Sequence, residues 1–410
     1  MSSPFSTTWV AAVTPQQWRT LVAAMLGWLL DAMDVMMYAF ALTAIRSEFS
    51  LSGAAAGALA SVTLLTSAVG GVAFGMIADR VGRARALVYS ILIYSVFTAL
   101  TATAQTLAQL VLWRSLVGIG LGGEWAAGSV LVAETWPAEH RGKAIGLMQS
   151  GWAIGYILAA LLASAIIPHH GWRVLFAVGV LPALLAAWIR RKVPEPEIWR
   201  KAGGGNRLHL GEVLRPPHLR NAAAATALAT FLLFAYWGLF TWIPAYLASP
   251  VASGGAGMSL VRSSAWIVPM QVGAFFGYVL FGVLADRFGR RPVFLVFVVG
   301  AAVLVPIYGR MALEPAVLMA LGPLLGFFGH GYFSLFGAML AELFPSSIRG
   351  TAQGFCYNVG RAASALAPYV IGALADRAGI GSALALTSAF FLAAGGLILA
   401  LPETRGEELR

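Results

Sequence analysis

GMIADRVGRAR at residues 75–85 returns as GVLADRFGRRP at residues 282–292. The two Asp-Arg pairs lie 207 residues apart, about half of the 410-residue chain. Two further pairs of strings are spaced by 208 residues: ETWPAEHRG at 134–142 with ELFPSSIRG at 342–350, and Pro194-Glu195 with Pro402-Glu403. Because three unrelated strings would not share nearly one offset by chance, we interpret the two halves as homologous repeats.

The composition places the chain in a membrane. Charged residues make up 11% of it and hydrophobic residues 59%, whereas soluble domains carry roughly 25% charged residues. A water-soluble surface cannot be built from that mixture. The single cysteine, Cys356, excludes an intrachain disulfide. No charged segment precedes the first apolar stretch, so we expect no cleaved signal peptide.

Twelve apolar stretches of roughly 20 residues could each cross about 30 Å of hydrocarbon as a helix. They lie near 20–44, 54–78, 86–104, 107–133, 143–167, 172–190, 221–247, 263–285, 293–310, 315–341, 351–375 and 381–401. We therefore expect an all-α membrane protein with twelve transmembrane helices in two pseudo-symmetric bundles, residues 1–190 and 221–410. The polar segment 191–220 is predicted to be a cytosolic linker.

The basic residues indicate the orientation. With a cytosolic N-terminus, 20 of the 27 Lys and Arg fall in inner loops and tails, two lie inside helices, and five lie outside: Arg46, Arg173, Arg262, Arg310 and Arg377. This positive-inside asymmetry predicts that both termini are cytosolic. It also explains the net charge of +10 without a nucleic-acid partner. We expect a monomer in a bacterial inner (plasma) membrane, with the linker attracted to anionic lipid headgroups.

The repeated G-x-x-x-D-R-x-G-R loops resemble the signature of the major facilitator superfamily, over the whole length of the chain. E-x-x-P-x-x-x-R-G at 134–142 and 342–350, and PETRG at 402–406, resemble its sugar-porter and metabolite:proton symporter branches. RSLVGIGLGGEWAAG at 114–128 is similar to a run of organic-acid symporters, and LLDAMD at 29–34 to the D-x-x-D of aromatic-acid symporters, which usually have Gly at the position of Ala32. The resemblance implies a twelve-helix transporter that works by alternating access.

Five charged side chains lie toward the middle of predicted helices: Asp31, Asp34, Arg114, Glu124 and Arg361. Such a group costs on the order of 3 kcal/mol at the centre of a spanning helix, so each needs a partner, a water-filled cavity or a role. We expect them to face a shared, water-accessible chamber between the two bundles.

The acids of the first half are candidates for proton coupling. Asp31, Asp34 and Tyr38 share one face of the first helix, with Trp28 behind them. In sugar porters that resemble this chain, an Asp of helix 1 pairs with an Arg of helix 4 and takes up the proton. The resemblance assigns that role to Asp34 and Arg114; the alternative is a permanent ion pair that pins the two helices.

Asp31 could be a second proton site or could contact substrate. Glu124 follows a run of glycines that would bring another helix backbone close, so it is either a proton-coupling group or part of a structural network. The same glycine run is no phosphate loop, because it lies inside an apolar helix.

Arg361 has no acid at its depth in the second half, so we expect it to bind an anionic substrate. The guanidinium fork matches a carboxylate with two parallel hydrogen bonds. Organic-anion carriers that this chain resembles also place an Arg in helix 11. The alternative is that Arg361 pairs with Asp31 or Glu124 and never meets substrate.

Aromatic and uncharged polar residues at mid-depth are predicted to line the cavity. They are Trp152, Tyr156, Tyr236, Trp237, Tyr332 and Tyr357, with Gln149, Gln271, His330 and Asn358. Such a lining would suit a small carboxylate with a ring or a short apolar body. Ordinary bundle packing is the alternative for each aromatic, and a structural donor role is the alternative for His330.

Charged residues at the predicted cytosolic helix ends form a candidate gate. They are Asp79, Arg80, Arg83, Glu134 and Arg141 in the first half and Asp286, Arg287, Arg290, Glu342 and Arg349 in the second. In the family such residues form ion-pair networks that hold the halves together on the inside while the cavity opens outward. Several weak pairs in one network can bias a two-state equilibrium.

The function favoured by these observations is a proton-coupled symporter of a small organic carboxylate, possibly aromatic. Three alternatives stay open: a proton-coupled sugar or polyol symporter, a proton-driven exporter, and a nutrient sensor that does not transport, although the short termini disfavour the sensor. An enzyme is disfavoured because the sequence has no nucleotide loop, metal-ligand cluster or activated nucleophile. No cofactor and no metal are expected.

Overall fold

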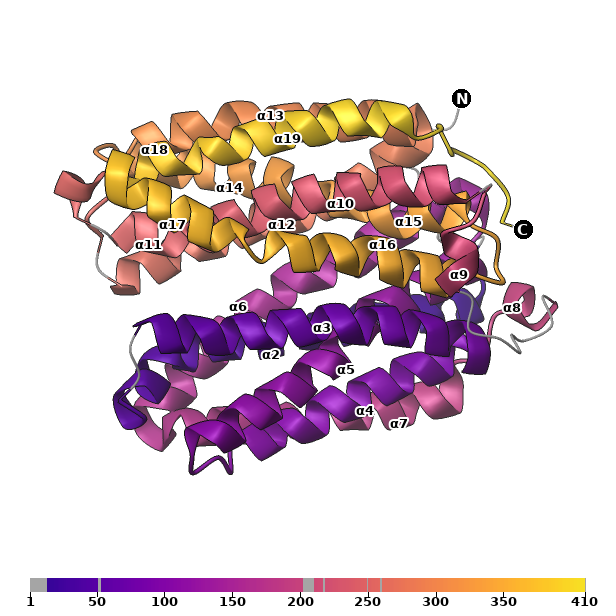
Figure 1. Cartoon of the computed structure of the whole chain (residues 1–410), viewed down its shortest axis with the longest axis horizontal. Coiled ribbons are helices and arrows are strands. Elements are labelled where there is room, and N and C mark those ends of the chain that lie inside the picture. Colours follow the sequence, from indigo (N-terminus) through magenta and orange to yellow (C-terminus); the bar gives the residue numbers. More distant parts are fainter. Residues whose placement is uncertain are drawn as a thin grey trace.

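The computed structural model describes residues 13–50, 53–201, 210–216, 218–248, 250–258 and 260–409. The side chains of Arg46 and Arg262, two of the basic residues predicted to lie outside, are not among those described. Within these ranges the regular structure is helical. Two bundles of long helices lie beside each other, with their helices along one common direction (Figure 1).

The first bundle contains α2 to α7, and α8 and α9 fall in the predicted linker. Their bounds are α2 (Pro15–Glu48), α3 (Gly53–Val81), α4 (Arg83–Thr101), α5 (Leu107–Thr135), η1 (Ala138–His140), α6 (Arg141–Ala177), η2 (Val178–Val180), α7 (Pro182–Lys192), α8 (Glu197–Lys201) and α9 (Leu210–Val213). Residues 202–209 and 217 of that linker lie outside the described part.

The second bundle contains α10 to α19, in which several predicted spans are divided into two shorter helices. Their bounds are α10 (Leu219–Phe240), α11 (Ile243–Ala248), η3 (Val251–Ser253), α12 (Leu260–Phe288), α13 (Arg290–Arg310), α14 (Pro315–Gly331), α15 (Phe333–Leu343), α16 (Arg349–Ser364), α17 (Ala367–Ala378), α18 (Ile380–Leu384), α19 (Leu386–Leu397) and η4 (Ile398–Ala400).

Local sequence explains where the helices begin and break. α2 begins at Pro15 because the Thr14 side chain accepts from the Gln17 backbone N–H, the Gln17 side chain accepts in return, and proline suits the first helical position. Gly171, at φ 75°, interrupts the long α6. The segment after Gly171 continues through η2 and α7, so α6 provides the fifth predicted crossing and the start of the sixth.

Ten segments of the described residues are long and apolar enough to cross a membrane. One of them, Ala138–Ile189, contains the break at Gly171 and so covers two predicted crossings. The predicted span at 351–375 is not among the ten, because α16 ends at Ser364 and is rich in polar residues. Its helices nevertheless lie in the second bundle beside α10 (Figure 1), and the expected twelve-helix architecture is confirmed.

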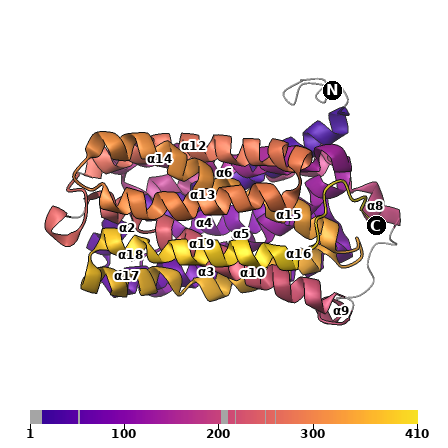
Figure 2. The same cartoon turned by 90° about the horizontal axis from the view of Figure 1, so that it is seen from above.

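The bundles meet where α3 packs on α16 and α6 packs on α12. Glycines permit this close approach: a Cβ on Gly75 would collide with the backbone of Gly350, and a Cβ on Gly282 with that of Gly142. Both contacts belong to the end of the molecule where α8 and α9 lie (Figure 2). We call this the linker end; it is the end that the sequence predicts to be cytosolic.

Candidate functional site

At the linker end, Asp79 of α3 joins the two bundles. Its carboxylate accepts from the backbone N–H groups of Gly350 (3.0 Å) and Thr351 (2.7 Å) at the start of α16, and from the Thr351 hydroxyl (2.6 Å). It also pairs with Arg83 at 2.8 Å. An anion at a helix N-terminus is favoured by the helix dipole, so this contact closes the interface between α3 and α16.

Glu134, at the end of α5, adds a second buried link between the bundles. Its carboxylate pairs with Arg83 of its own bundle at 3.0 Å and with Arg349 of the other. The Ser346 hydroxyl donates to the same carboxylate at 2.8 Å. All the charges of this group therefore have partners, as a buried ion network requires.

The second half repeats the arrangement with the bundles exchanged. Asp286 of α12 accepts from the backbone N–H groups of Gly142 (3.0 Å) and Lys143 (2.8 Å) at the start of α6, and pairs with Arg290 at 2.6 Å. Two pseudo-symmetric clamps thus close the linker end.

Glu342 is the second-half counterpart of Glu134. It pairs with Arg290 at 3.0 Å and with Arg141 of the first bundle at 2.8 Å, and it accepts from the Thr404 hydroxyl at 2.6 Å. Arg141 also donates to the backbone carbonyl of Glu407, so the C-terminal segment joins the closed end.

The repeated Pro-Glu pairs cap helices at this end. Glu195 accepts from two backbone N–H groups at the start of α4, and Glu403 from two at the start of α13. Two predicted gate residues are placed differently: Arg80 and Arg287 are exposed and take no part in the ion pairs of the described residues. They follow the clamping aspartates directly, and the helix turns their side chains outward.

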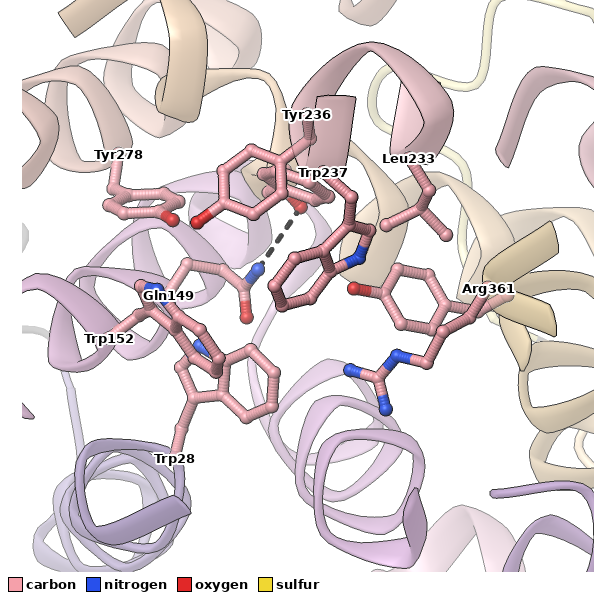
Figure 3. A pocket seen from close by; sticks show the side chains of 10 residues that line it. Trp28, Gln149, Trp152, Leu233, Tyr236, Trp237, Tyr278 and Arg361 are labelled. Atoms are coloured by element: carbon pink, nitrogen blue, oxygen red, sulfur yellow. Dashed lines mark hydrogen bonds between the residues drawn. The ribbon is translucent and has the colours of Figure 1, made fainter. Parts of the chain in front are cut away.

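A cavity lies between the bundles. It is lined by Trp28, Gln149, Trp152, Leu233, Tyr236, Trp237, Tyr278, Phe333, Tyr357 and Arg361. Figure 3 shows Trp28 and Trp152 on one side of the opening and the Arg361 guanidinium on the other. The first bundle therefore contributes part of an aromatic wall, and the second bundle contributes the single charged group of this lining.

Arg361 lies at the wall of this cavity on α16 and is 7% exposed. Its Nη1 donates to the Ser67 hydroxyl at 3.2 Å, and its guanidinium carbon lies 5.3 Å from the centre of the Tyr357 ring. Nε has no hydrogen-bond partner, and no carboxylate of the described residues lies within ion-pair distance. The alternative in which Arg361 forms an ion pair with Asp31 or Glu124 is therefore not observed.

The uncharged polar groups of the lining are partly engaged. Gln149 Oε1 accepts from the Trp125 indole at 3.1 Å, and its Nε2 donates weakly to the Phe333 carbonyl at 3.4 Å. The indole N–H groups of Trp28, Trp152 and Trp237 have no partner among the described residues. Polar atoms that the protein leaves unpaired at a cavity wall are available to an occupant.

Asp34 and Arg114 form the predicted ion pair, at 3.3 Å, and each is at most 2% exposed. Asp34 also accepts from the Thr98 hydroxyl of α4 at 2.6 Å. The Arg114 guanidinium lies over the Tyr38 ring at 4.9 Å and near the Phe176 ring at 5.7 Å. Neither partner lines the central cavity, so the expectation that Asp34 shares a chamber with Arg361 is wrong for this structure. The reason is that Asp34 turns toward α4 and α5, into its own bundle.

Asp31 and Glu124 are buried and neither lines the central cavity. Asp31 interacts electrostatically with both Arg361 and Asp34, but it has no ion pair within 4.0 Å in the described part. Glu124 is fully buried, and neither of its oxygens has a hydrogen-bond partner there. The Glu124 carboxylate touches Gly27 of α2, since a Cβ added to Gly27 would collide with it.

Some predicted lining residues lie elsewhere. Tyr156 and Gln271 line a second, smaller cavity with Phe40 and Ile267. Asn358 faces Gly71 across the bundle interface and donates to the Gly354 carbonyl. Tyr38 packs on Arg114 as described, and Tyr332 is buried within the second bundle.

His330 is also off the cavity. It hydrogen-bonds the Gly326 carbonyl through Nδ1 at 3.1 Å, and its ring packs edge-on against Tyr236 and Tyr278. Its Nε2 has no partner in the described part. His330 therefore fits the structural donor role, packed behind the tyrosines of the cavity wall, better than a role in the cavity.

Three residues of the lining were not predicted: Leu233, Tyr278 and Phe333. Tyr278 lies seven residues after Gln271, on the same face of α12, so helical spacing could have found it. Phe333 reaches the cavity because the chain breaks between α14 and α15 at Tyr332. No sequence signal marks that break.

Comparison with known proteins agrees with this architecture. The sequence model of the family described as Major Facilitator Superfamily matches residues 24–273 and 255–410. The chain therefore belongs to the major facilitator superfamily, a family of membrane transporters rather than enzymes.

Relatives of known name cover almost the whole chain. A "Probable 4-methylmuconolactone transporter" of Cupriavidus pinatubonensis is 36% identical and covers 97% of this chain and 93% of its own length. A "Cis,cis-muconate transport protein" of Acinetobacter baylyi is 35% identical, with 91% of both chains covered. Among solved structures, the proton:xylose symporter XylE has a TM-score of 0.80 at 20% identity, covering 96% of this chain and 98% of XylE, which is a likeness of fold.

Proposed function

We propose that this protein transports a small organic monocarboxylate together with a proton, by alternating access. The observation that carries the proposal is Arg361, a buried cation at the wall of the central cavity with an unpaired Nε and no carboxylate of the described part within ion-pair distance, although Asp31 acts on it from farther away. A buried charge without a counter-ion is costly, and a substrate carboxylate would supply that counter-ion in the geometry that a guanidinium prefers.

The other lining residues and the relatives support an organic anion over a sugar. A polyol offers donors and acceptors in equal number, and it would need free acceptors in the wall. The carboxamide oxygen of Gln149 is already used by Trp125. Two relatives are named as transporters of muconate and of 4-methylmuconolactone. Both compounds are organic acids, which supports an organic anion over a sugar; muconate carries two carboxylates, so the single charge is argued from the cavity lining alone.

The proton step is assigned to Asp34. Protonation of Asp34 would remove its attraction to Arg114 and release a contact that ties α2 to α5. Because this pair lies inside the first bundle rather than in the cavity, the proton would act on substrate through the packing of α2, which also carries Trp28. A proton that crosses with a monoanion moves no net charge against the membrane potential.

The clamps at the linker end are assigned to gating. With Asp79 and Asp286 bound to the opposite bundle, this end is closed, and transport requires both contacts to break and re-form. We further propose, from the positive-inside pattern, that this end faces the cytosol of a bacterial cell and that the protein acts in the inner membrane as a monomer.

The test is substrate binding to purified protein, followed by uptake into proteoliposomes. Thermal shift and calorimetry would compare benzoate, an aliphatic monocarboxylate and xylose on the natural protein, Arg361→Gln and Arg361→Lys. We expect carboxylates to bind and Arg361→Gln to weaken them about 10- to 100-fold, the range for hydrogen bonds between charged groups. Arg361→Lys should retain part of the affinity, because the charge stays while the fork is lost.

Two controls make the result decisive. Arg310→Gln removes an exposed arginine at the end of α13 and should leave binding unchanged. Uptake should exceed equilibrium only with an inward proton gradient. Binding of xylose alone, unaffected by Arg361→Gln, would contradict the proposal, and carboxylate uptake that ignores the proton gradient would contradict its proton-coupled part.

A further inference from the structure

Besides Arg361, the central cavity is lined by a second kind of unpaired hydrogen-bond donor, a tryptophan indole N–H. Trp28 of α2 lines the cavity, is 4% exposed, and its indole N–H has no partner in the described part. An indole N–H can only donate, and buried tryptophans usually find an acceptor for it. The indole N–H of the neighbouring Trp152, whose ring lies 4.9 Å away, also has no hydrogen-bond partner in the described part, so this side of the cavity presents two unpaired donors, of which Trp28 is the one on α2.

No oxygen of the wall accepts from Trp28 in this structure. Besides the hydroxyls of Tyr236, Tyr278 and Tyr357, the lining has one side-chain oxygen, Gln149 Oε1, which accepts from Trp125 at 3.1 Å. No Asp, Glu, Ser, Thr or Asn is among the lining residues described. An occupant of the cavity that carries an acceptor would therefore supply the hydrogen bond that the wall does not give to Trp28.

The position of Trp28 relative to Arg361 restricts that occupant. Trp28 and Arg361 belong to different bundles, and they approach the opening from opposite sides (Figure 3). A substrate whose carboxylate pairs with Arg361 would place its far side toward Trp28. The lining has no second cation on that side, so a second carboxylate there would be buried without a counter-ion, which is strongly unfavourable.

We infer that the preferred substrates are monocarboxylates that carry an uncharged hydrogen-bond acceptor, such as a carbonyl or a ring nitrogen, on the side away from the carboxylate. This inference rests on the proposed carboxylate function of Arg361 and adds a second contact, from the Trp28 indole N–H to the neutral acceptor. Trp28 is thus a specificity-determining residue, and the aromatic wall separates one charged subsite from one neutral subsite.

Four rings of nearly equal size test this inference: benzoate, nicotinate, isonicotinate and terephthalate. The two pyridine carboxylates replace one ring C–H of benzoate by a neutral acceptor, and terephthalate adds a second charge. Calorimetry on the purified full chain should show that at least one pyridine isomer binds about 3- to 10-fold more tightly than benzoate, the range of one hydrogen bond. Terephthalate should bind more weakly than benzoate.

Tryptophan variants assign the preference to one donor. Trp28→Phe keeps an aromatic ring and removes the N–H, so the ratio of pyridine carboxylate to benzoate affinity should fall to about one, as expected when a single hydrogen bond is lost. Trp266→Phe removes an unpaired N–H outside the cavity lining and should leave the ratio unchanged. A ratio is insensitive to a general loss of folded protein.

The outcomes separate this inference from the proposed function. Benzoate binding as tightly as both pyridine isomers, terephthalate binding most tightly, or an unchanged ratio in Trp28→Phe would overturn the inference while Arg361 retains its assigned role. No binding of any of the four acids would overturn the proposed function itself.

Discussion

The two bundles have matching charges at one end and different charges in their interiors. At the linker end, Asp79 and Asp286 make equivalent contacts with the start of a helix in the opposite bundle. In the interior, the first bundle holds Asp31, Asp34, Glu124 and Arg114, whereas the lining of the central cavity draws its cation from the second bundle. Duplication preserved the contacts that must open and close, while the interiors diverged.

This difference suggests a division of labour. A gate between two rocking bodies needs the same strength on both sides, so matching clamps are expected there. Proton and substrate are chemically different, so their sites need not match. We therefore expect changes in the interior to separate the two activities and changes at the clamps to affect both alike.

The largest effect is expected from Asp34→Asn. The change leaves Arg114 as a buried charge without its partner, which typically costs about 3–5 kcal/mol. We expect proton-driven accumulation to fall by about 100-fold or more, the loss typical when a proton-transferring side chain is removed, because Asn cannot take up the proton. Exchange of external for internal substrate should continue, because Arg361 and the cavity lining are untouched. Proteoliposomes allow both to be measured on one preparation.

Thr98→Val is the matched control, since it removes the other hydrogen bond to Asp34 and leaves the ion pair. It should lower transport much less than Asp34→Asn. Equal loss of accumulation and exchange in Asp34→Asn would mean that Asp34 serves the whole transport cycle, and the division between the bundles would then fail.

A smaller, paired effect is expected at the clamps. Asp79→Asn and Asp286→Asn each weaken charged hydrogen bonds worth about 1.5–3 kcal/mol, so each should shift the population toward a state open at the linker end by about 10-fold or more. Asp79→Asn should have the larger effect, because Thr351 donates a side-chain bond at 2.6 Å. Its counterpart in the repeat is Lys143, which donates through its backbone.

Accessibility of a cysteine reports this shift. Ser129 of α5 donates to Gln353 of α16 across the interface at 2.8 Å and is fully buried. In a Cys356→Ala background, Ser129→Cys should react faster with a water-soluble thiol reagent once either clamp is weakened. Faster labelling in only one of the two variants, Asp79→Asn or Asp286→Asn, would show that the two clamps are not equivalent.

The fold was predictable from the sequence because apolar length and an internal repeat both depend on local composition. The ion pair of Asp34 with Arg114 and the clamps were predictable for a related reason: their positions follow from helix register and from the repeated motifs. Which residues line the cavity was less predictable from the sequence. Gln271 was expected in the central cavity and lines the second one, whereas Phe333 was not expected and lines the central cavity. Both depend on the rotation of a helix and on the break at Tyr332, which tertiary packing sets.

Glu124 tests whether the interior acids act together. Both of its oxygens lack partners in the described part, so replacing it by the neutral isostere Gln breaks no observed hydrogen bond. We expect Glu124→Gln to change the unfolding free energy by less than about 1 kcal/mol, in the range of the milder substitutions. Proton-coupled uptake should fall less than in Asp34→Asn. Uptake abolished as completely as in Asp34→Asn would make Glu124 a second essential proton site.

The smallest effect is expected at the opposite end, where Glu48 of α2 meets Arg173 at 2.6 Å and accepts from the Trp172 indole at 2.7 Å. The hydrogen bond from Arg173, followed by that from Trp172, lowers the pKa of Glu48. A lowered pKa stabilises the folded state above the ordinary glutamate pKa of about 4.3, and that contribution is lost as the pH falls through the lowered value. Because both side chains are about 40% exposed, solvent screening leaves at most about 1 kcal/mol. Glu48→Gln should therefore lower the melting temperature slightly at neutral pH and less as the pH falls below 4, with high salt reducing the difference. A pH-independent difference between the two proteins would show that the contact is not electrostatic, and this end would then differ from the clamps in kind rather than in strength.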